Sequence, residues 1–230
     1  MRVRKRTVVV LASVVVLVVL GLGAGLALLV LHEPGYYARC EVAPGAERLE
    51  LSKKCVGTIF SMAGNIAGGA PEWAGEITHE QLNSMFAEDF MKWGEAESLR
   101  RVGITKPRII FEQDRMRLAF RYGTGVFSTV ISLDIKVWLA PQDTNVVAVE
   151  FLGRYAGSLP ISAHALLEVL SAQAREQNTE VTWYRHNGNP VALVRFQANR
   201  LRPTFQLHRL ELLDGKIAIA GKNVPEASTY

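Results

Sequence analysis

The sequence lacks the residue patterns that mark the common catalytic and nucleotide-binding sites. No serine lies in a G-x-S-x-G elbow, neither cysteine has a nucleophile context, and no G-x-x-x-x-G-K-S/T or EF-hand loop is present. The five histidines show no metal-ligand spacing, and they are His32, His79, His164, His186 and His208. We therefore expect a protein that is not an enzyme and that holds no metal or cofactor.

One near-match to a zinc motif fails at its last position. Residues 79–83 spell H-E-Q-L-N, whereas the zinc-binding pattern H-E-x-x-H needs a second histidine where Asn83 stands. Thr78 and Gln81 instead form the capping box of a helix expected over 77–93, and Ile77 with Leu82 makes its hydrophobic staple. His79 and Glu80 are then polar residues of a first helical turn.

Charged residues and prolines are both absent from Thr7 to Leu31, a run of 25 residues. A helix of that length covers roughly 37 Å, enough to cross a hydrocarbon core about 30 Å thick. A secretory signal has a shorter apolar region followed by a small-residue cleavage site, and no convincing site follows here. The run predicts a retained transmembrane anchor at 7–31, with a cleaved signal as the alternative.

The flanking charges predict the orientation of this anchor. Arg2, Arg4, Lys5 and Arg6 form a basic stub at 1–6, and positive residues next to a span stay on the cytoplasmic side. The chain is therefore expected in the inner (cell) membrane as a single-pass protein with its C-terminal part outside the cytoplasm. Residues 32–47, rich in Pro and Gly, are interpreted as a linker, and residues 48–230 as the exported domain.

The formal net charge of +4 does not indicate a nucleic-acid-binding protein. Four of the 26 basic residues lie in the stub, which leaves 22 against 22 acidic residues beyond the span. An exported part with no net charge has no bulk attraction for phosphate backbones. The expected partners are the membrane bilayer, a bound lipid, or another envelope protein, and no nucleic acid.

The two cysteines, Cys40 and Cys55, lie close to the anchor in the exported part. In an oxidising compartment they would be able to pair, and such a disulfide is worth roughly 3 kcal/mol on the chain-entropy model. Two free thiols are the alternative.

Hydrophobic periodicity predicts an α+β domain. Apolar residues recur at helical spacing over 49–66, and a second helix is expected over 162–178, from an N-cap at Ser162 to a stop at Asn178. Strands alternate over 109–111, 116–122, 126–139 and 147–155, with a turn at Gln113-Asp114. The tail predicts two further hairpins, a bulge between Leu207 and Leu210, and a turn at Asp214-Gly215.

Strand length predicts a curved sheet with one apolar face. The 14 residues from Val126 to Leu139 would extend roughly 46 Å, whereas a helix of about 15 residues spans only some 22 Å. Part of that face must be covered by something else, such as lipid, a partner or the 49–66 helix. The candidate groove residues are Met116, Leu118, Phe120, Phe127, Ile131, Leu133, Ile135, Val137, Val147, Val149 and Phe151.

The order of these elements resembles a known bacterial pattern. The stretches that carry the resemblance are EITHEQLNSMF (76–86), PRIIFEQDRMRLAF (107–120), GSLPISAHALLEVL (157–170) and FQLHRLELLDGKIAIAG (205–221). They resemble the YpmS-like and LmeA-like membrane-anchored proteins of the TULIP-like (tubular lipid-binding) type. The resemblance implies a long antiparallel sheet curved around amphipathic helices, an apolar groove for acyl chains, and no catalytic residues.

Two functions are compatible with this pattern. The first is an envelope protein that binds a lipid or amphiphile in an apolar groove. The second is an anchored scaffold or interaction protein whose apolar face is a filled core without a ligand. They differ in whether space remains between the sheet and what covers it.

Overall fold

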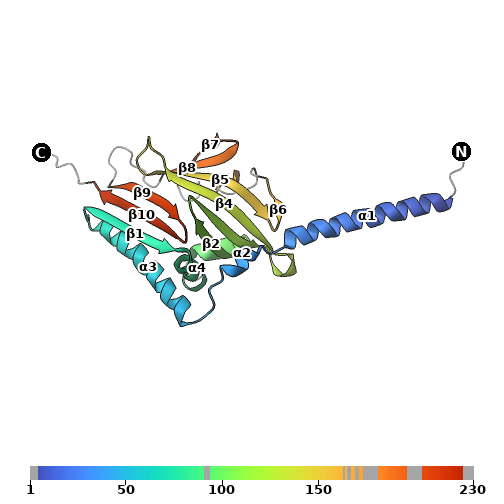
Figure 1. The fold of residues 1–230 in the computed structure, drawn as a ribbon, viewed down its shortest axis with the longest axis horizontal. Helices are drawn as coiled ribbons and strands as arrows, with labels where there is room; N and C mark the ends of the chain where they lie inside the picture. Colours follow the sequence, from blue (N-terminus) through green and yellow to red (C-terminus); the bar gives the residue numbers. More distant parts are fainter. Residues whose placement is uncertain are drawn as a thin grey trace.

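A long apolar helix projects from an α+β domain. The structure, a computed structural model, describes residues 5–90, 94–162, 164, 167–168, 171–172, 181–195 and 204–224. Helix α1 (Lys5–Leu31) extends away from the rest of the chain as a rod (Figure 1). Within the described chain, one helical stretch, Ser13–Arg39, is long and apolar enough to cross a membrane, and its apolar window is 0% buried. This confirms the predicted apolar helix and fits a membrane anchor or a signal sequence.

The domain contains two antiparallel sheets. The larger has seven strands in the order β2-β3-β4-β5-β8-β7, with β6 paired to β5, and the smaller has the order β1-β10-β9. The strands are β1 (Glu72–Thr78), β2 (Ile104–Glu112), β3 (Arg115–Tyr122), β4 (Thr129–Leu139), β5 (Val146–Ala156), β6 (Leu159–Pro160), β7 (Val181–His186), β8 (Asn189–Arg195), β9 (Phe205–Leu213) and β10 (Lys216–Asn223). The α+β class and the large antiparallel sheet agree with the prediction.

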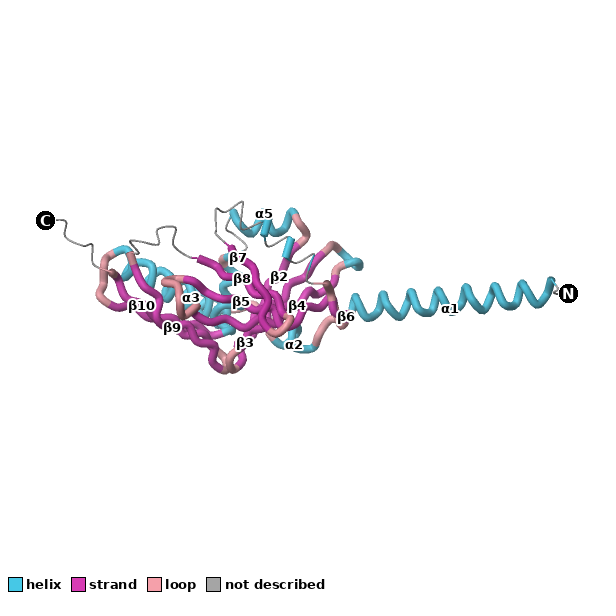
Figure 2. Tube along the Cα trace, turned by 90° about the horizontal axis from the view of Figure 1, so that it is seen from above, coloured by secondary structure: helices cyan, strands magenta, loops and turns pink. Residues whose placement is uncertain are grey.

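Four helices and one short 3-10 turn complete the described domain. They are α2 (Gly35–Arg39), α3 (Ala46–Ala67), α4 (His79–Glu88), α5 (Gly94–Arg101) and the turn η2 (Gly125–Phe127). Seen from above, α5 and α2 lie on opposite sides of the large sheet (Figure 2). Most of the helix expected over 162–178 lies outside the described residues.

Helix α3 covers the small sheet and packs against α4. Their shared core is built around Cys55, Ile77 and Met85, all buried. The packing is close, because a Cβ on Gly75 of β1 would come within 2.4 Å of the Met62 sulfur. The predicted amphipathic helix therefore exists, and it begins three residues earlier than its periodicity indicated.

The local signals in the sequence are confirmed where they fall on described residues. Thr78 caps α4 with both hydrogen bonds of the capping box, although the helix ends at Glu88 rather than at residue 93. The predicted turns contain Asp114 (φ 61°) and Gly215 (φ 80°). The predicted bulge is also present, since the pairing of β9 with β10 steps from Arg209 to Leu207.

The longest predicted strand is shorter than its alternation suggested. Strand β4 has 11 residues and begins at Thr129, so it extends roughly 36 Å rather than the 46 Å expected from 14 residues. Gly123 (φ 95°) and Gly125 (φ 57°) turn the chain before it, and residues 125–127 form the 3-10 turn. Phe127 is 85% exposed and does not lie on the inward face, which corrects the prediction for that residue.

Candidate functional site

The first candidate site is the apolar face of the large sheet. Antiparallel register pairs Met116 with Ile135, Leu118 with Leu133, and Phe120 with Ile131, so residues of β3 and β4 share one face. Strand β5 continues it, because Val149 pairs with Val137 and Phe151 with Ile135. At the centre of this face Leu133, Ile135, Phe151 and Ala192 are each 4% exposed.

Most of the predicted groove residues come together on this face. Nine of the eleven belong to one cluster, and they are Met116, Leu118, Phe120, Ile131, Leu133, Ile135, Val137, Val149 and Phe151. Val147 pairs with Leu139 and is buried outside that cluster, and Phe127 is exposed to solvent. Nine of the candidates therefore share one face of the sheet, and their role as a lipid groove stays a prediction.

Strands β7 and β8 extend the apolar face with residues that the sequence analysis did not single out. Val181, Trp183, Ala192 and Val194 pack on the same cluster. The Trp183 indole N–H donates a hydrogen bond to Ser171 Oγ at 3.0 Å. Alternation within the first of the two hairpins predicted in the tail indicates an apolar side, but nothing in the local sequence shows that this hairpin joins β5.

The apolar face is buried at its centre and partly exposed at both ends of β4, since Val137 at the far end is partly exposed as well. Phe120 and Ile131, at the end nearest α1, are partly exposed, whereas Leu133 and Ile135 farther along β4 are buried. The end nearest α1 is identified by Thr129, whose hydroxyl donates a hydrogen bond to the Val30 carbonyl. The apolar face thus starts beside the last turn of α1.

The second candidate site is on the opposite, polar face of the same sheet, where the segment after α1 is docked. Tyr37 of α2 is 1% exposed and packs on Ala119 and Val130. Its hydroxyl donates a hydrogen bond to the Lys106 carbonyl at 2.8 Å. Residues 32–47, interpreted as a linker, are therefore partly folded onto the domain.

Arginine side chains of the sheet hold this segment. The Arg108 guanidinium lies 4.3 Å from the centre of the Tyr37 ring, and that of Arg117 lies 4.6 Å from the centre of the Tyr36 ring. Arg108 also pairs with Glu41 at 2.7 Å. Burial raises the pKa of both tyrosines, and the hydrogen bond from Arg108 lowers the pKa of Glu41. Both tyrosines are therefore neutral phenols at physiological pH.

The end of α1 is bonded to the loops and strands of the large sheet at close range. The Ser158 N–H donates a hydrogen bond to the Leu29 carbonyl at 2.9 Å, and Glu33 forms an ion pair with Arg121. Gly157 has φ 58°, and a Cβ there would lie 2.3 Å from the carbonyl oxygens of both Leu29 and Val30. Only glycine fits this approach without moving the end of α1.

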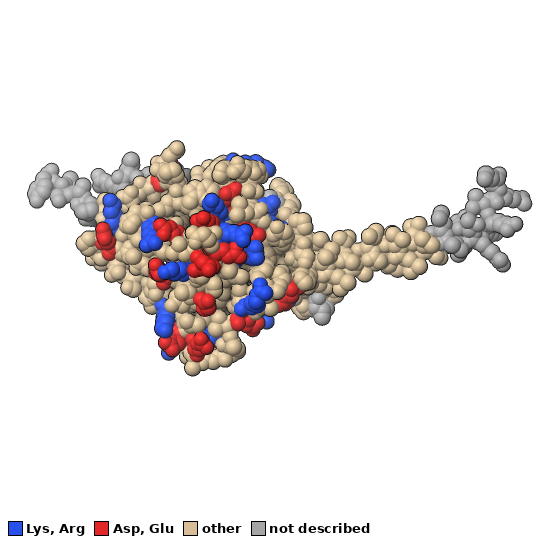
Figure 3. Space-filling model, in the orientation of Figure 1, with Lys and Arg blue, Asp and Glu red and all other residues tan. Residues whose placement is uncertain are grey.

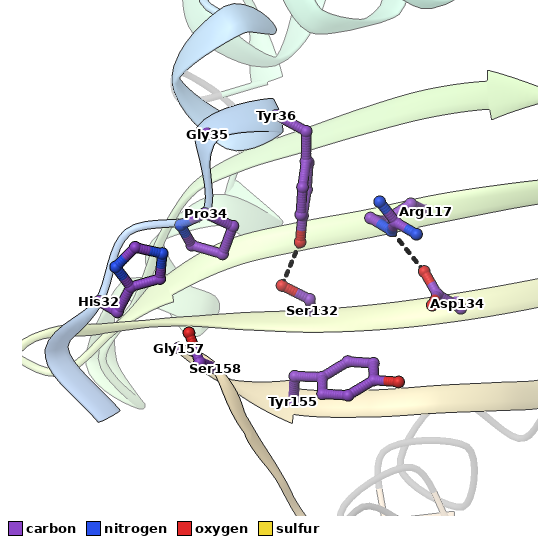
Figure 4. A pocket seen from close by; sticks show the side chains of 10 residues that line it. All are labelled: His32, Pro34, Gly35, Tyr36, Arg117, Ser132, Asp134, Tyr155, Gly157 and Ser158. Atoms are coloured by element: carbon purple, nitrogen blue, oxygen red, sulfur yellow. Dashed lines mark hydrogen bonds and ion pairs between the residues drawn. The ribbon is translucent and has the colours of Figure 1, made fainter. Parts of the chain in front are cut away.

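A cavity of about 340 Å³ lies between α2 and the sheet (Figure 4). Tyr36 donates a hydrogen bond to Ser132, and Arg117 is paired with Asp134 at 2.5 Å. Tyr155, His32 and Ser158 complete its polar lining. Arg117 and Asp134 neutralise each other, so they offer no unpaired charge to an ionic ligand.

The charged surface shows no patch of one sign on the face drawn in Figure 3, where basic and acidic side chains alternate. Many form ion pairs, such as Arg48 with Glu88 at 2.5 Å and Lys216 with Glu76 at 2.6 Å. In the part of the chain that the structure describes, no three His, Cys, Asp or Glu side chains gather as a metal site.

The two cysteines are free thiols in different surroundings. Cys40 follows α2 and is partly exposed, and Cys55 is 0% exposed in the core between α3 and α4. Burial raises the pKa of the Cys55 thiol to about 11. Of the two alternatives left open by the sequence, the structure has the free thiols.

Comparisons of this chain with protein-family models, curated protein sequences and solved structures found no match.

Proposed function

We propose that this chain is a single-pass, membrane-anchored envelope protein whose exported domain binds a lipid or another amphiphile on the apolar face of the large sheet. In this proposal α1 crosses the inner membrane with the basic stub in the cytoplasm, and the domain has no catalytic role. The resemblance to YpmS-like and LmeA-like proteins, with a sheet curved around amphipathic helices, points to the same function.

The observation that carries the proposal is the position of the apolar face relative to α1. Ile131 lies two residues beyond Thr129, which is hydrogen-bonded to Val30 at the end of α1. An acyl chain leaving the outer leaflet beside α1 would meet Phe120 and Ile131 first, and both are partly exposed. Burying an apolar chain there is favourable by about 25 cal/mol for each Å² removed from water.

The alternative is an anchored scaffold with a filled core. It is favoured by the low exposure of the central residues, since Leu133, Ile135, Phe151 and Ala192 are each 4% exposed. Three cavities lined by described residues also lie elsewhere, on the side of α2 and α4. In that case the apolar face packs only on its own chain, and a partner protein binds another surface.

Photo-cross-linking from two neighbouring positions on β4 distinguishes the two functions. Val137 lies on the apolar face, and Lys136 is exposed on the opposite face. A benzophenone amino acid is placed at each position in the full chain in native membranes. Val137 is six residues beyond Ile131, roughly 20 Å farther along the strand from the end of β4 that is bonded to α1, so a lipid adduct there requires an acyl chain that extends along the face.

The lipid-binding proposal expects a lipid adduct from the Val137 position and none from Lys136. Cross-links from Val137 that reach only the protein's own chain, with the fold intact, would contradict lipid binding and leave the scaffold.

The membrane anchor is tested by separate experiments. The full chain should resist extraction by alkaline carbonate, and a reporter fused after Tyr230 should behave as exported.

A further inference from the structure

We propose that the end of the domain next to α1 is itself a membrane-contacting surface. An apolar rim formed by Val102, Tyr122 and Phe127 would enter the interfacial layer of the bilayer that α1 crosses. The inference rests on the proposed anchoring of α1, but it does not depend on lipid binding along the apolar face. It assigns a role to Phe127 that differs from the predicted place in the groove.

The three rim residues are exposed apolar side chains held close together by two turns. They are 58%, 49% and 85% exposed, respectively. The Gly123 N–H donates a hydrogen bond to the Gly103 carbonyl at 3.0 Å, which joins the residues that follow Tyr122 and Val102. A Cβ on Gly123 would lie 3.0 Å from the Phe127 carbonyl oxygen. Single exposed apolar residues are ordinary, whereas this group occupies one end of the domain.

The rim lies level with the last turn of α1. Tyr122 pairs with Thr129, and the Thr129 hydroxyl donates a hydrogen bond to the Val30 carbonyl. The hydrogen bond from Ser158 to Leu29 and the tight approach at Gly157 fix the neighbouring loop to the same turn. In Figure 1 the turn between β3 and β4 accordingly lies beside the end of α1 that meets the domain.

The length of the apolar run places this turn of α1 at the membrane surface. The 25 uncharged residues cover roughly 37 Å, which is longer than a hydrocarbon core of about 30 Å but shorter than the 40–45 Å that include the head groups. Leu29 and Val30 therefore lie at the boundary of the head-group layer. Because the domain is bonded directly to them, the rim lies in that layer too.

The chemistry of the rim suits this layer. Aromatic side chains are favoured at membrane–water interfaces, because the apolar ring contacts the acyl chains while a tyrosine hydroxyl stays in contact with water and head groups. Arg101, immediately before Val102, has a side chain that is 77% exposed and lies near lipid phosphates in this arrangement. A second copy of the chain is another possible cover for an apolar rim, and the experiment must separate the two.

Fluorescence quenching in vesicles tests the rim. The full chain is reconstituted in phosphatidylcholine and phosphatidylglycerol vesicles, in one set with acyl chains brominated near the head group and in a second set with acyl chains brominated near the methyl end, which lies at the depth of Leu20. The test variant is Phe127→Trp. The matched control is Phe60→Trp, which replaces a phenylalanine that is 67% exposed on α3. Leu20→Trp, in the middle of α1, reports whether α1 itself lies in the bilayer.

The proposal expects Phe127→Trp to gain emission that is shifted to the blue and quenched by the lipid brominated near the head group. Phe60→Trp should gain emission at longer wavelength that neither brominated lipid quenches. If Leu20→Trp is quenched and Phe127→Trp is not, the rim is refuted and the anchor stands. If neither is quenched, the anchor fails and the rim fails with it. Blue-shifted emission without quenching, together with a cross-linked dimer, would assign the rim to a second copy and also overturn the proposal.

Discussion

The side-chain amide of Asn83 forms two hydrogen bonds with the backbone of Ile109. Asn83 Nδ2 donates to the Ile109 carbonyl at 2.9 Å, and Asn83 Oδ1 accepts from the Ile109 N–H at 2.7 Å. Ile109 lies on β2, an edge strand of the large sheet, and among the described residues no strand pairs with the outward side of β2. The amide satisfies those groups as a neighbouring strand would, and it attaches α4 to the sheet.

Loss of this amide should therefore destabilise the domain. Asn83 is buried, so Asn83→Ala leaves the Ile109 N–H and carbonyl unpaired and should cost roughly 2–4 kcal/mol. Asn65→Ala on α3 is the matched control, because Asn65 is exposed and alanine favours a helix. Urea unfolding measures both, and equal stability of the two variants would contradict the role assigned to Asn83.

A second asparagine, Asn145, also uses its side-chain amide to bond to the backbone of an edge strand. Asn145 Nδ2 donates to the Phe205 carbonyl and Asn145 Oδ1 accepts from the Leu207 N–H, both at 2.7 Å. This joins the turn before β5 to β9, an edge strand of the small sheet. The two sheets are thus linked by a side chain that imitates backbone.

Gly157 should be much harder to replace than a glycine in an open turn. Gly157→Ala would combine a positive φ with a clash against the Leu29 and Val30 carbonyls. Gly188→Ala is the matched control, since Gly188 has φ 83° and nothing within 4 Å of its added Cβ. The control should lose about 1 kcal/mol, and Gly157→Ala distinctly more. Thermal unfolding of the full chain in detergent measures the difference, and equal losses would show that the junction can move.

Tyr37 should hold the segment after α1 on the sheet. Removing this buried ring in Tyr37→Ala should cost roughly 3–5 kcal/mol and release α2. Trypsin should then cut the Tyr37→Ala variant at Arg39. The Tyr37→Phe variant loses only the hydrogen bond to the Lys106 carbonyl, so its Arg39 should stay protected. Tyr184→Ala, at a residue 41% exposed, is the control. Protection of Arg39 in Tyr37→Ala would mean that other contacts suffice.

The contrast between these residues explains what the sequence predicts well. The capping box at Thr78, the turn at Gly215 and the bulge at His208 depend on neighbours within a few residues, so local chemistry determines them. The alternation of β3 and β4 likewise identifies one apolar face. These features give the α+β class, most of the strands and most of the groove candidates.

What the sequence does not predict depends on partners far along the chain. Pro34 and Gly35 suggest a linker, and nothing near them indicates that Tyr37 packs under Arg108, 71 residues away. Arg115, Arg117 and Arg121 alternate with the apolar residues of β3, and nothing near them in the sequence indicates that Arg117 stacks on Tyr36. In the sequence, Asn83 stands out only because it replaces the second histidine of a zinc motif. Its hydrogen bonds to β2 cannot be predicted locally, because Ile109 lies far along the chain.

The free energy of unfolding at alkaline pH should reveal the raised pKa of the buried Cys55 thiol. The pKa of Cys55 is raised from 9.0 to about 11, so the folded state holds the proton more tightly than the unfolded state. The resulting stabilisation is complete below pH 9 and is lost as pH rises toward 11, by roughly 2 kcal/mol. Burial also raises the pKa of Tyr36 and Tyr37, but these titrate equally in Cys55→Ala.

The measurement is the free energy of unfolding at pH 8 and at pH 11 for the wild type and for Cys55→Ala. The wild type should lose more between the two values than the variant does. Parallel losses in both proteins would show that the Cys55 thiol titrates normally.

Two tryptophan substitutions on β4 separate a filled core from an open groove. Leu133 is 4% exposed at the centre of the apolar face, so Leu133→Trp should overpack it and cost typically 1–3 kcal/mol. Ile131, two residues nearer α1 on the same face, is partly exposed. If lipid enters there, Ile131→Trp should leave the stability nearly unchanged and reduce the lipid adduct formed from position 137.

Both substitutions introduce a tryptophan on the same face of β4, so they differ only in how buried the position is. Unfolding measures stability, and the yield of lipid adduct from a benzophenone at Val137 measures occupancy of the face beyond the entrance. A filled core predicts that both variants are destabilised and that neither forms a lipid adduct. The Ile131→Trp variant would support the groove if it lost the lipid adduct and kept its stability. The tryptophan would then block the path of an acyl chain past Ile131 without disturbing the core.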